Sequence, residues 1–136
     1  MMKRYIDTNI FLNSILYSDK KAAQCVKIIS KIIEKEIIGI TSVLTWDEFV
    51  YVVYKNLGKE IAIKEGEKFL KLPNLYLISA DKNIIMKSQN LIREFNVKPR
   101  DAIHAATAIL NNIHEIISDD MDFDNIKEIK RISPEN

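Results

Sequence analysis

Acidic side chains at four separate places in the sequence are the residues best suited to chemistry. They lie in the segments YIDTNIFL (residues 5–12), TWDEF (45–49), PRDAIHAATA (99–108) and ISDDMDFD (117–124). The carboxylates of interest are Asp7, Glu48, Asp101 and Asp120. Carboxylate oxygens are hard ligands that suit Mg²⁺ and Mn²⁺. Their chemistry depends on whether the fold gathers them into one place.

Short apolar runs rich in β-branched residues alternate with longer stretches of helical periodicity. The runs predict strands at residues 4–6, 37–41, 75–79, 116–118 and, more weakly, 128–132. The periodic stretches predict helices at residues 20–35, 44–57, 60–72, 81–95 and 99–112, and a further helix follows Asp7. Strands separated by helices are typical of a three-layer α/β/α sandwich around a parallel sheet. We expect one such domain over residues 1–136.

A helix that leaves a parallel strand begins at the carboxyl edge of the sheet, where open α/β sheets place their ligand sites. Asp7 ends the first strand, and Glu48 lies in the first turns of the helix after the second strand. Asp101 opens the helix that runs into the fourth strand, and Asp119 and Asp120 follow that strand. All of them are therefore predicted at the same edge.

Each acid also has a purely structural interpretation. Asp7 could cap the helix that follows it, and Glu48 could form a capping box with Thr45. Asp101 could complement a helix dipole, and the acids of residues 119–124 could form a solvated turn. These structural interpretations are less convincing when all must hold at once, because the carboxylates would then repel one another at one edge of the sheet. Two unit charges ~4 Å apart repel by about 4 kcal/mol at an effective dielectric near 20. Divalent cations would relieve that repulsion, and a single cysteine with no closely spaced pair of histidines argues against Zn²⁺.

The charge distribution favours a solvated surface, with cation binding by the acidic block and an anionic polymer bound by the basic remainder as the alternatives. Residues 101–124 hold six acids and no Lys or Arg, whereas residues 1–100 carry a net charge of +6. Lys82, Lys98 and Arg100 flank the predicted edge and are candidates for phosphate contacts, although any one of them could simply be solvated. The apolar content of 47% and the lone Cys25 indicate a soluble protein of a reducing compartment. With no secretion signal and no membrane-length apolar run, we expect a cytoplasmic protein without membrane contact.

The motifs YIDTNIFL, RDAIHAATA and ISDDMDFD, with Glu48 between the first two, together resemble PIN-domain ribonucleases. The resemblance covers essentially the whole chain and is greatest to the small VapC-type toxins of toxin–antitoxin pairs. It implies a five-stranded parallel sheet in the order 3-2-1-4-5. It also implies Mg²⁺- or Mn²⁺-dependent hydrolysis of RNA, a small antitoxin protein as partner, and a homodimer.

The resemblance assigns residues to roles. The acidic quartet is matched by Asp7, Glu48, Asp101 and Asp120, and the polar residues that orient it are matched by Thr8, Asn9 and Ser118. Asp7, Asp101 and Asp120 are then metal ligands, while Glu48 either binds a metal or orients the attacking water. The extra acids after the fourth strand leave the last ligand open, in the order Asp120, then Asp122, then Asp119.

Several alternatives remain at the sequence level. His104 lies one turn beyond Asp101 and is interpreted as a packed, hydrogen-bonded histidine rather than as a catalytic base. Surplus apolar residues in WDEFVYVVYKNL (residues 46–57) could form a homodimer surface or a groove for an antitoxin peptide. The function could instead be RNA maturation or RNA binding without cleavage. A receiver-like phosphoacceptor domain is a further alternative, because it also carries an acidic Mg²⁺ site on an α/β fold.

Overall fold

The computed structural model describes residues 2–135, and its centre is a parallel sheet. The sheet contains β1 (Met2–Ile6), β2 (Ile37–Ser42), β3 (Leu75–Ile78), β4 (Glu115–Ile117) and β5 (Lys130–Ile132). Within this part of the chain the strand order is β3-β2-β1-β4-β5, and every neighbouring pair is parallel. The predicted fold class and strand order are confirmed. Receiver-type sheets follow the order 2-1-3-4-5, so the receiver-like alternative is wrong.

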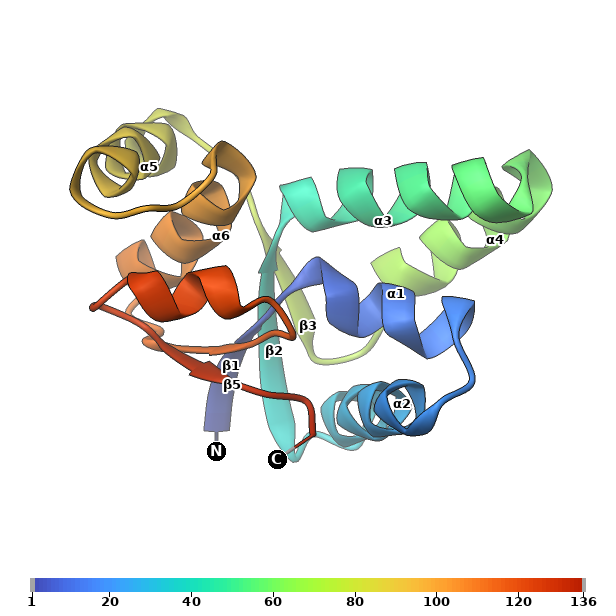
Figure 1. The fold of residues 1–136 in the computed structure, drawn as a ribbon. Helices are drawn as coiled ribbons and strands as arrows, with labels where there is room; N and C mark the ends of the chain where they lie inside the picture. The colour runs from blue at the N-terminus through green and yellow to red at the C-terminus, as the bar shows by residue number, and fades with distance from the viewer. Residues whose placement is uncertain (1, 136) are drawn as a thin grey trace.

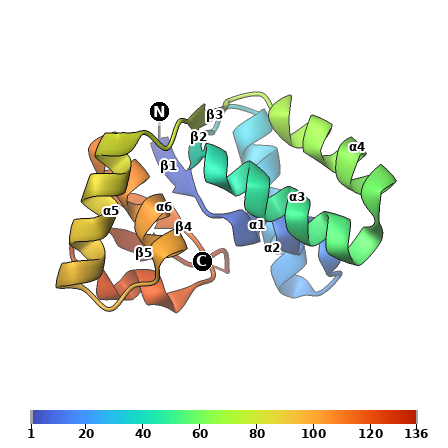
Figure 2. The same cartoon turned by 90° about the horizontal axis from the view of Figure 1, so that it is seen from above.

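Helices cover both faces of the sheet. They are α1 (Thr8–Leu16), α2 (Lys20–Ile33), α3 (Val43–Leu57), α4 (Lys59–Leu70), α5 (Lys82–Glu94), α6 (Pro99–Leu110) and the short 3₁₀ helix η1 (Met121–Asn125). Helices α5 and α6 lie on one side of the strands and α1 to α4 lie on the other (Figures 1 and 2). The predicted boundaries lie within two residues of the observed ones. None of the helices in residues 2–135 combines the length and apolarity needed to cross a membrane.

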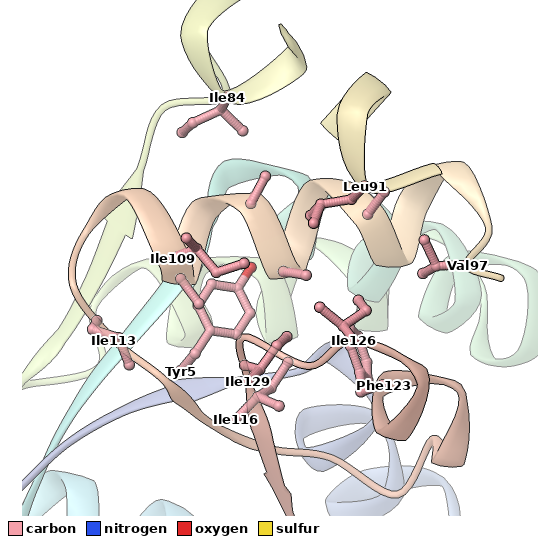
Figure 3. Packing of buried hydrophobic residues seen from close by; sticks show 14 of the residues in the cluster. Tyr5, Ile84, Leu91, Val97, Ile109, Ile113, Ile116, Phe123, Ile126 and Ile129 are labelled. Atoms are coloured by element: carbon pink, nitrogen blue, oxygen red, sulfur yellow. The ribbon is translucent and has the colours of Figure 1, made fainter. Parts of the chain in front are cut away.

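Alternation along the strands divides the core into two clusters, because successive side chains of a strand point to opposite faces. Tyr5 and Ile116 face α5, α6 and η1, whereas Ile6 and Ile117 face α1 to α4. Figure 3 shows Tyr5 and Ile116 packed below Ile109 of α6. Each fully buried isoleucine contributes roughly 1.5–3 kcal/mol of burial free energy. The alternation therefore fixes which strand residues can reach α6.

The helix starts define the edge at which a site can form. Asp7 caps α1, and its side chain accepts a hydrogen bond from the backbone N–H of Thr8. Helix α3 begins at Val43 and is capped by Ser42. The proposed capping box of Thr45 and Glu48 is therefore wrong, since Thr45 lies inside the helix, fully buried. Helix α3 thus starts earlier than a capping box would place it, which puts Glu48 in its second turn.

Candidate active site

The carboxyl ends of β1 and β4 bring the four predicted acids together. These two strands are neighbours at the point where the strand order reverses, the usual location of a ligand site in an open α/β sheet. Asp7 follows β1, Asp120 follows β4, and α3 and α6 supply Glu48 and Asp101. All four line one open pocket at this edge. Residues separated by more than a hundred positions in the sequence thus share one surface.

Within residues 2–135, Asp101, Asp120 and Asp122 form a close group of carboxylates. One oxygen of each lies within 4.8 Å of an oxygen of the others. Burial, followed by the negative charges of Asp120 and Asp7, raises the pKa of Asp101 to about 7. A hard-oxygen donor set with this unfavourable crowding of charge fits Mg²⁺ or Mn²⁺.

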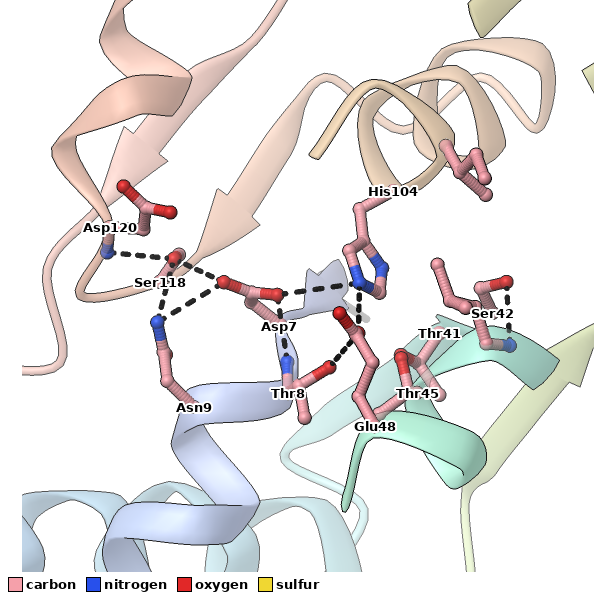
Figure 4. A network of polar contacts seen from close by, with 12 residues as sticks. Asp7, Thr8, Asn9, Thr41, Ser42, Thr45, Glu48, His104, Ser118 and Asp120 are labelled. Atoms are coloured by element: carbon pink, nitrogen blue, oxygen red, sulfur yellow. Dashed lines mark hydrogen bonds and ion pairs between the residues drawn. The ribbon is translucent and has the colours of Figure 1, made fainter. Parts of the chain in front are cut away.

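The carboxylate of Asp7 is held by three neighbours. It accepts hydrogen bonds from the Thr8 backbone N–H at 2.8 Å, the Ser118 hydroxyl at 2.6 Å and the Asn9 amide at 3.2 Å (Figure 4). The Ser118 oxygen in turn accepts the backbone N–H of Asp120 at 2.9 Å. Burial raises the pKa of Asp7, although the charge of His104 and the hydrogen bonds from Ser118 and Thr8 oppose that effect. Asp7 therefore both caps α1 and forms a wall of the pocket, and Ser118 links it to Asp120.

Glu48 is anchored through one of its oxygens. Its Oε1 accepts the Thr8 hydroxyl at 2.7 Å and lies 2.6 Å from Nε2 of His104 (Figure 4). Burial raises the pKa of Glu48, but the hydrogen bond and the charge of His104 outweigh burial and lower it overall. Glu48 is therefore ionised at neutral pH. It supplies a fixed negative charge beside Asp7.

His104 is a buried histidine with a partner on each ring nitrogen. Its side chain is 1% exposed, and its Nδ1 lies 2.6 Å from the hydroxyl of Tyr5. Burial lowers the pKa of His104, but the hydrogen bond to Glu48 and the charge of Asp7 raise it overall. This arrangement agrees with the packed, hydrogen-bonded histidine that the sequence indicated.

With this geometry in place, comparison with known proteins identifies the family. The sequence model of the PIN domain matches residues 4–129. The chain belongs to the PIN-domain family. No curated protein matches the chain at significant sequence similarity.

Several solved structures share the fold of this PIN domain. VapBC2 from Rickettsia felis, bound to a DNA fragment from its promoter, has a TM-score of 0.76 at 20% identity and covers 97% of this chain and 98% of that chain. A toxin–antitoxin complex from Klebsiella pneumoniae has a TM-score of 0.67 at 25% identity, covering 96% and 97%. VapC20 from Mycobacterium tuberculosis, a toxin that cleaves the sarcin–ricin loop, has a TM-score of 0.72 at 14% identity, covering 88% and 92%.

The acids after β4 differ in their surroundings within this PIN domain. Asp119 forms an ion pair with Lys21 at 2.9 Å, and its backbone N–H donates to the Asn9 side chain at 3.2 Å. The backbone N–H of Asp122 instead donates a hydrogen bond to a carboxylate oxygen of Asp120 at 2.9 Å, and the Asp122 carboxylate belongs to the close group of three. The geometry therefore ranks Asp120 and Asp122 before Asp119 as candidate ligands.

We predict that Asp122→Asn weakens Mn²⁺ binding whereas Asp119→Asn does not. The first change removes a carboxylate from the close group, and the second removes one that is already paired with Lys21. Calorimetric titration with Mn²⁺ would measure the difference. Equal losses of Mn²⁺ affinity in the two variants would show that membership of the close group does not determine which carboxylate binds the ion.

Sequence reasoning missed two residues, Tyr5 and Arg131, that hold the residues of the site in place through hydrogen bonds. The Tyr5 hydroxyl accepts the backbone N–H of Ser42 at 3.0 Å and contacts His104. Arg131 of β5 donates to the backbone oxygen of Ser118 at 3.1 Å and pairs with Asp124. A tyrosine two residues before Asp7 was the available signal for the first contact, because residues two apart in an extended strand point to the same face of the sheet.

The predicted basic residues are placed unequally. Arg100 lines the acidic pocket, and together with Lys98 it also lines an adjoining pocket that contains Glu48 and Asp101. Lys82 opens α5 and is not among the residues that line either pocket. Lys98 and Arg100 are therefore the better candidates for contacts to a substrate phosphate.

Proposed function

We propose that this PIN domain is a Mg²⁺- or Mn²⁺-dependent endoribonuclease that hydrolyses phosphodiester bonds in RNA, acting as the toxin of a toxin–antitoxin pair. The observation that carries the proposal is the close group of Asp101, Asp120 and Asp122, which shares a pocket edge with Asp7 and Glu48. The family is one of nucleases, and the similar structures include toxins of this class.

Each residue has a defined task in the proposed reaction. Asp101 and Asp120, with Asp7 and Asp122 beside them, would hold the divalent ion. Such an ion activates water for in-line attack on phosphorus and stabilises the leaving oxygen.

The supporting residues fix the carboxylates before substrate arrives. Asn9 and Ser118 hold one oxygen of Asp7, and the backbone of Thr8 holds the other. Thr8 and His104 both engage Oε1 of Glu48, so Oε2 is the oxygen directed to its proposed task. That task is either to bind the ion or to orient the attacking water. Fixing groups in this way lowers the reorganisation needed during reaction.

Substrate binding is assigned to Lys98 and Arg100. Both are exposed and adjoin Asp101 at the start of α6. We predict that Lys98→Gln and Arg100→Gln each weaken RNA binding and reduce the slope of log affinity against log salt by about 0.7. Lys71→Gln is the matched control, because Lys71 is also exposed but precedes β3 at the opposite edge of the sheet. Binding measured by fluorescence anisotropy at several salt concentrations tests this. An unchanged slope in both variants would contradict the assignment.

The proposed protein partners are an antitoxin and a second copy of the chain. Helices α3 and α4 leave apolar side chains exposed along a shared groove, among them Trp46, Tyr54, Ile63 and Leu70. An amphipathic peptide segment buries such a surface well. The Rickettsia and Klebsiella structures are toxin–antitoxin complexes, which supports an antitoxin. A small antitoxin-like reading frame that overlaps or adjoins the gene, and co-purification of its product, test this assignment.

The decisive test of activity is incubation of the protein with structured and unstructured RNAs in Mg²⁺, Mn²⁺ or EDTA, followed by mapping of product ends. Water-dependent cleavage is expected with either ion, and EDTA is expected to abolish it. Products that carry a 2′,3′-cyclic phosphate, or full activity in EDTA, would contradict the proposal. RNA binding without cleavage under all conditions would favour a non-cutting PIN domain. Cleavage without growth inhibition on expression would favour RNA maturation.

A further inference from the structure

Beyond the acidic residues, we propose that His104 is a positioning residue that orients Glu48 for the reaction, and that Tyr5 in turn orients His104. The inference rests on the proposed nuclease function and deepens it. A chain of hydrogen bonds runs from the backbone of Ser42 through Tyr5 and His104 to Glu48. Ser42, Tyr5 and His104 lie behind the pocket, and only Glu48 lines it.

The contacts along this chain are short and shielded from solvent. The Ser42 N–H lies 3.0 Å from the Tyr5 hydroxyl, that hydroxyl lies 2.6 Å from His104 Nδ1, and Nε2 lies 2.6 Å from Glu48 Oε1. Ser42 and Tyr5 are fully buried, and His104 is 1% exposed. Water therefore cannot replace a lost partner without opening the core. Each missing hydrogen bond would leave a buried polar group unsatisfied.

The direction of the hydrogen bonds follows from the two ends of the chain. A backbone N–H can only donate, so the Tyr5 oxygen accepts from Ser42. An ionised carboxylate can only accept, so the His104 nitrogen that faces Glu48 carries a proton. The single proton of the Tyr5 hydroxyl is donated to Nδ1 when the ring is neutral, and Nδ1 donates to the Tyr5 oxygen when the ring is charged. His104 thus donates to Glu48 through Nε2 whether its ring is neutral or charged.

The chain connects three of the four elements that position the acids, namely β1, α3 and α6. Ser42 caps α3, the helix that also carries Glu48. Tyr5 lies in β1 two residues before Asp7, and His104 lies in α6 one turn after Asp101. A shift of α6 relative to α3 would therefore break the bond to Glu48. The arrangement resembles the general case in which an outer hydrogen-bonding partner orients a ligand, whose loss typically costs 10–100-fold in activity.

Substitutions at His104 test the role. His104→Leu removes the donor while still filling the buried space with an apolar side chain. We expect kcat to fall by about 10–100-fold with little change in the KM for RNA. His104→Gln keeps an amide N–H near the position of Nε2 and is expected to recover most of kcat. Tyr5→Phe keeps the ring but frees His104 to rotate, and is expected to lower kcat less than His104→Leu. Wild-type kcat in both His104→Leu and Tyr5→Phe would overturn the inference.

A double-mutant cycle separates positioning from packing. If His104 acts through Glu48, adding His104→Leu to Glu48→Gln causes no further loss of kcat. If His104 contributes only to packing, the loss is the same in both backgrounds, which would overturn the inference. Where His104→Leu fails to fold, the same cycle is run with Tyr5→Phe.

An independent readout keeps this inference distinguishable from the proposed function. Nitrogen-15 NMR of the wild-type protein should show a proton on Nε2 of His104, and a bare Nε2 with a protonated Nδ1 would overturn the chain of hydrogen bonds. This measurement needs no RNA. Failure of the wild-type protein to cleave RNA with Mg²⁺ or Mn²⁺ would instead remove the proposed function. Cleavage that is insensitive to His104 would remove only the inference.

Discussion

Replacing Asp101 with asparagine is expected to abolish metal-dependent RNA cleavage and to raise the melting temperature of the metal-free protein. The carboxylate of Asp101 is disfavoured by burial and by the charges of Asp120 and Asp7, and the amide removes this repulsion while keeping the shape. A gain of 1 kcal/mol corresponds to roughly 4 °C in a domain of this size. The loss of activity should exceed the ~100-fold that removal of an outer partner costs.

Thermal unfolding at pH 8 in EDTA, together with RNA cleavage in Mn²⁺, measures both effects of Asp101→Asn. Asp119→Asn is the matched control, because it removes a carboxylate that is paired with Lys21. The control should keep its activity and should not gain stability. Wild-type cleavage by Asp101→Asn, or a lower melting temperature than that of the wild type, would be incompatible with the proposed role of Asp101.

The affinity for Mn²⁺ is expected to rise with pH up to about 7 and then to level off. Burial, with the charges of Asp120 and Asp7, raises the pKa of Asp101 to about 7, so below that pH a proton must leave before the metal binds. The affinity should fall by up to about tenfold for each pH unit below 7. Calorimetric titration between pH 5.5 and 8, in buffers with different heats of ionisation, gives both the affinity and the number of protons released.

The same pKa predicts the pH dependence of stability without metal. The pKa of Asp101 in the folded protein lies above its ordinary value of 3.8, so the folded state holds a proton that the unfolded chain has released. Stability from this group is therefore lost as pH rises from about 4 to about 7. Asp101→Asn should lack this loss. A Mn²⁺ affinity independent of pH over the same range would contradict the raised pKa.

The fold was predictable because its signals are local and repeated. The short apolar runs of the strands, helical periodicity and residues such as Pro99 mark the five strands and the helices α2 to α6 to within two positions, whereas η1 was not predicted. The convergence of Asp7, Glu48, Asp101 and Asp120 followed from topology, since each lies at the carboxyl edge of a parallel sheet. The sequence therefore predicted which residues would meet without any knowledge of side-chain contacts.

The contacts behind the pocket were not predictable in the same way. Tyr5 meets His104 only because β1 presents Tyr5 to α6, and this depends on how α6 packs across the sheet. Ser42 rather than Thr45 caps α3, because β2 extends directly into the helix without a loop. The choice among Asp119, Asp120 and Asp122 depends on the turn after β4, where Lys21 from α2 neutralises Asp119. Such contacts involve elements distant in sequence.

The most direct test of the central claim is anomalous diffraction from crystals of the protein grown or soaked with Mn²⁺. The structure predicts an anomalous peak enclosed by the carboxylates of Asp101 and Asp120, on the side of the pocket that Asp7 borders. The peak should be absent from crystals of Asp101→Asn treated in the same way. Millimolar Mn²⁺ that leaves this pocket without a peak in the wild-type protein would contradict the account.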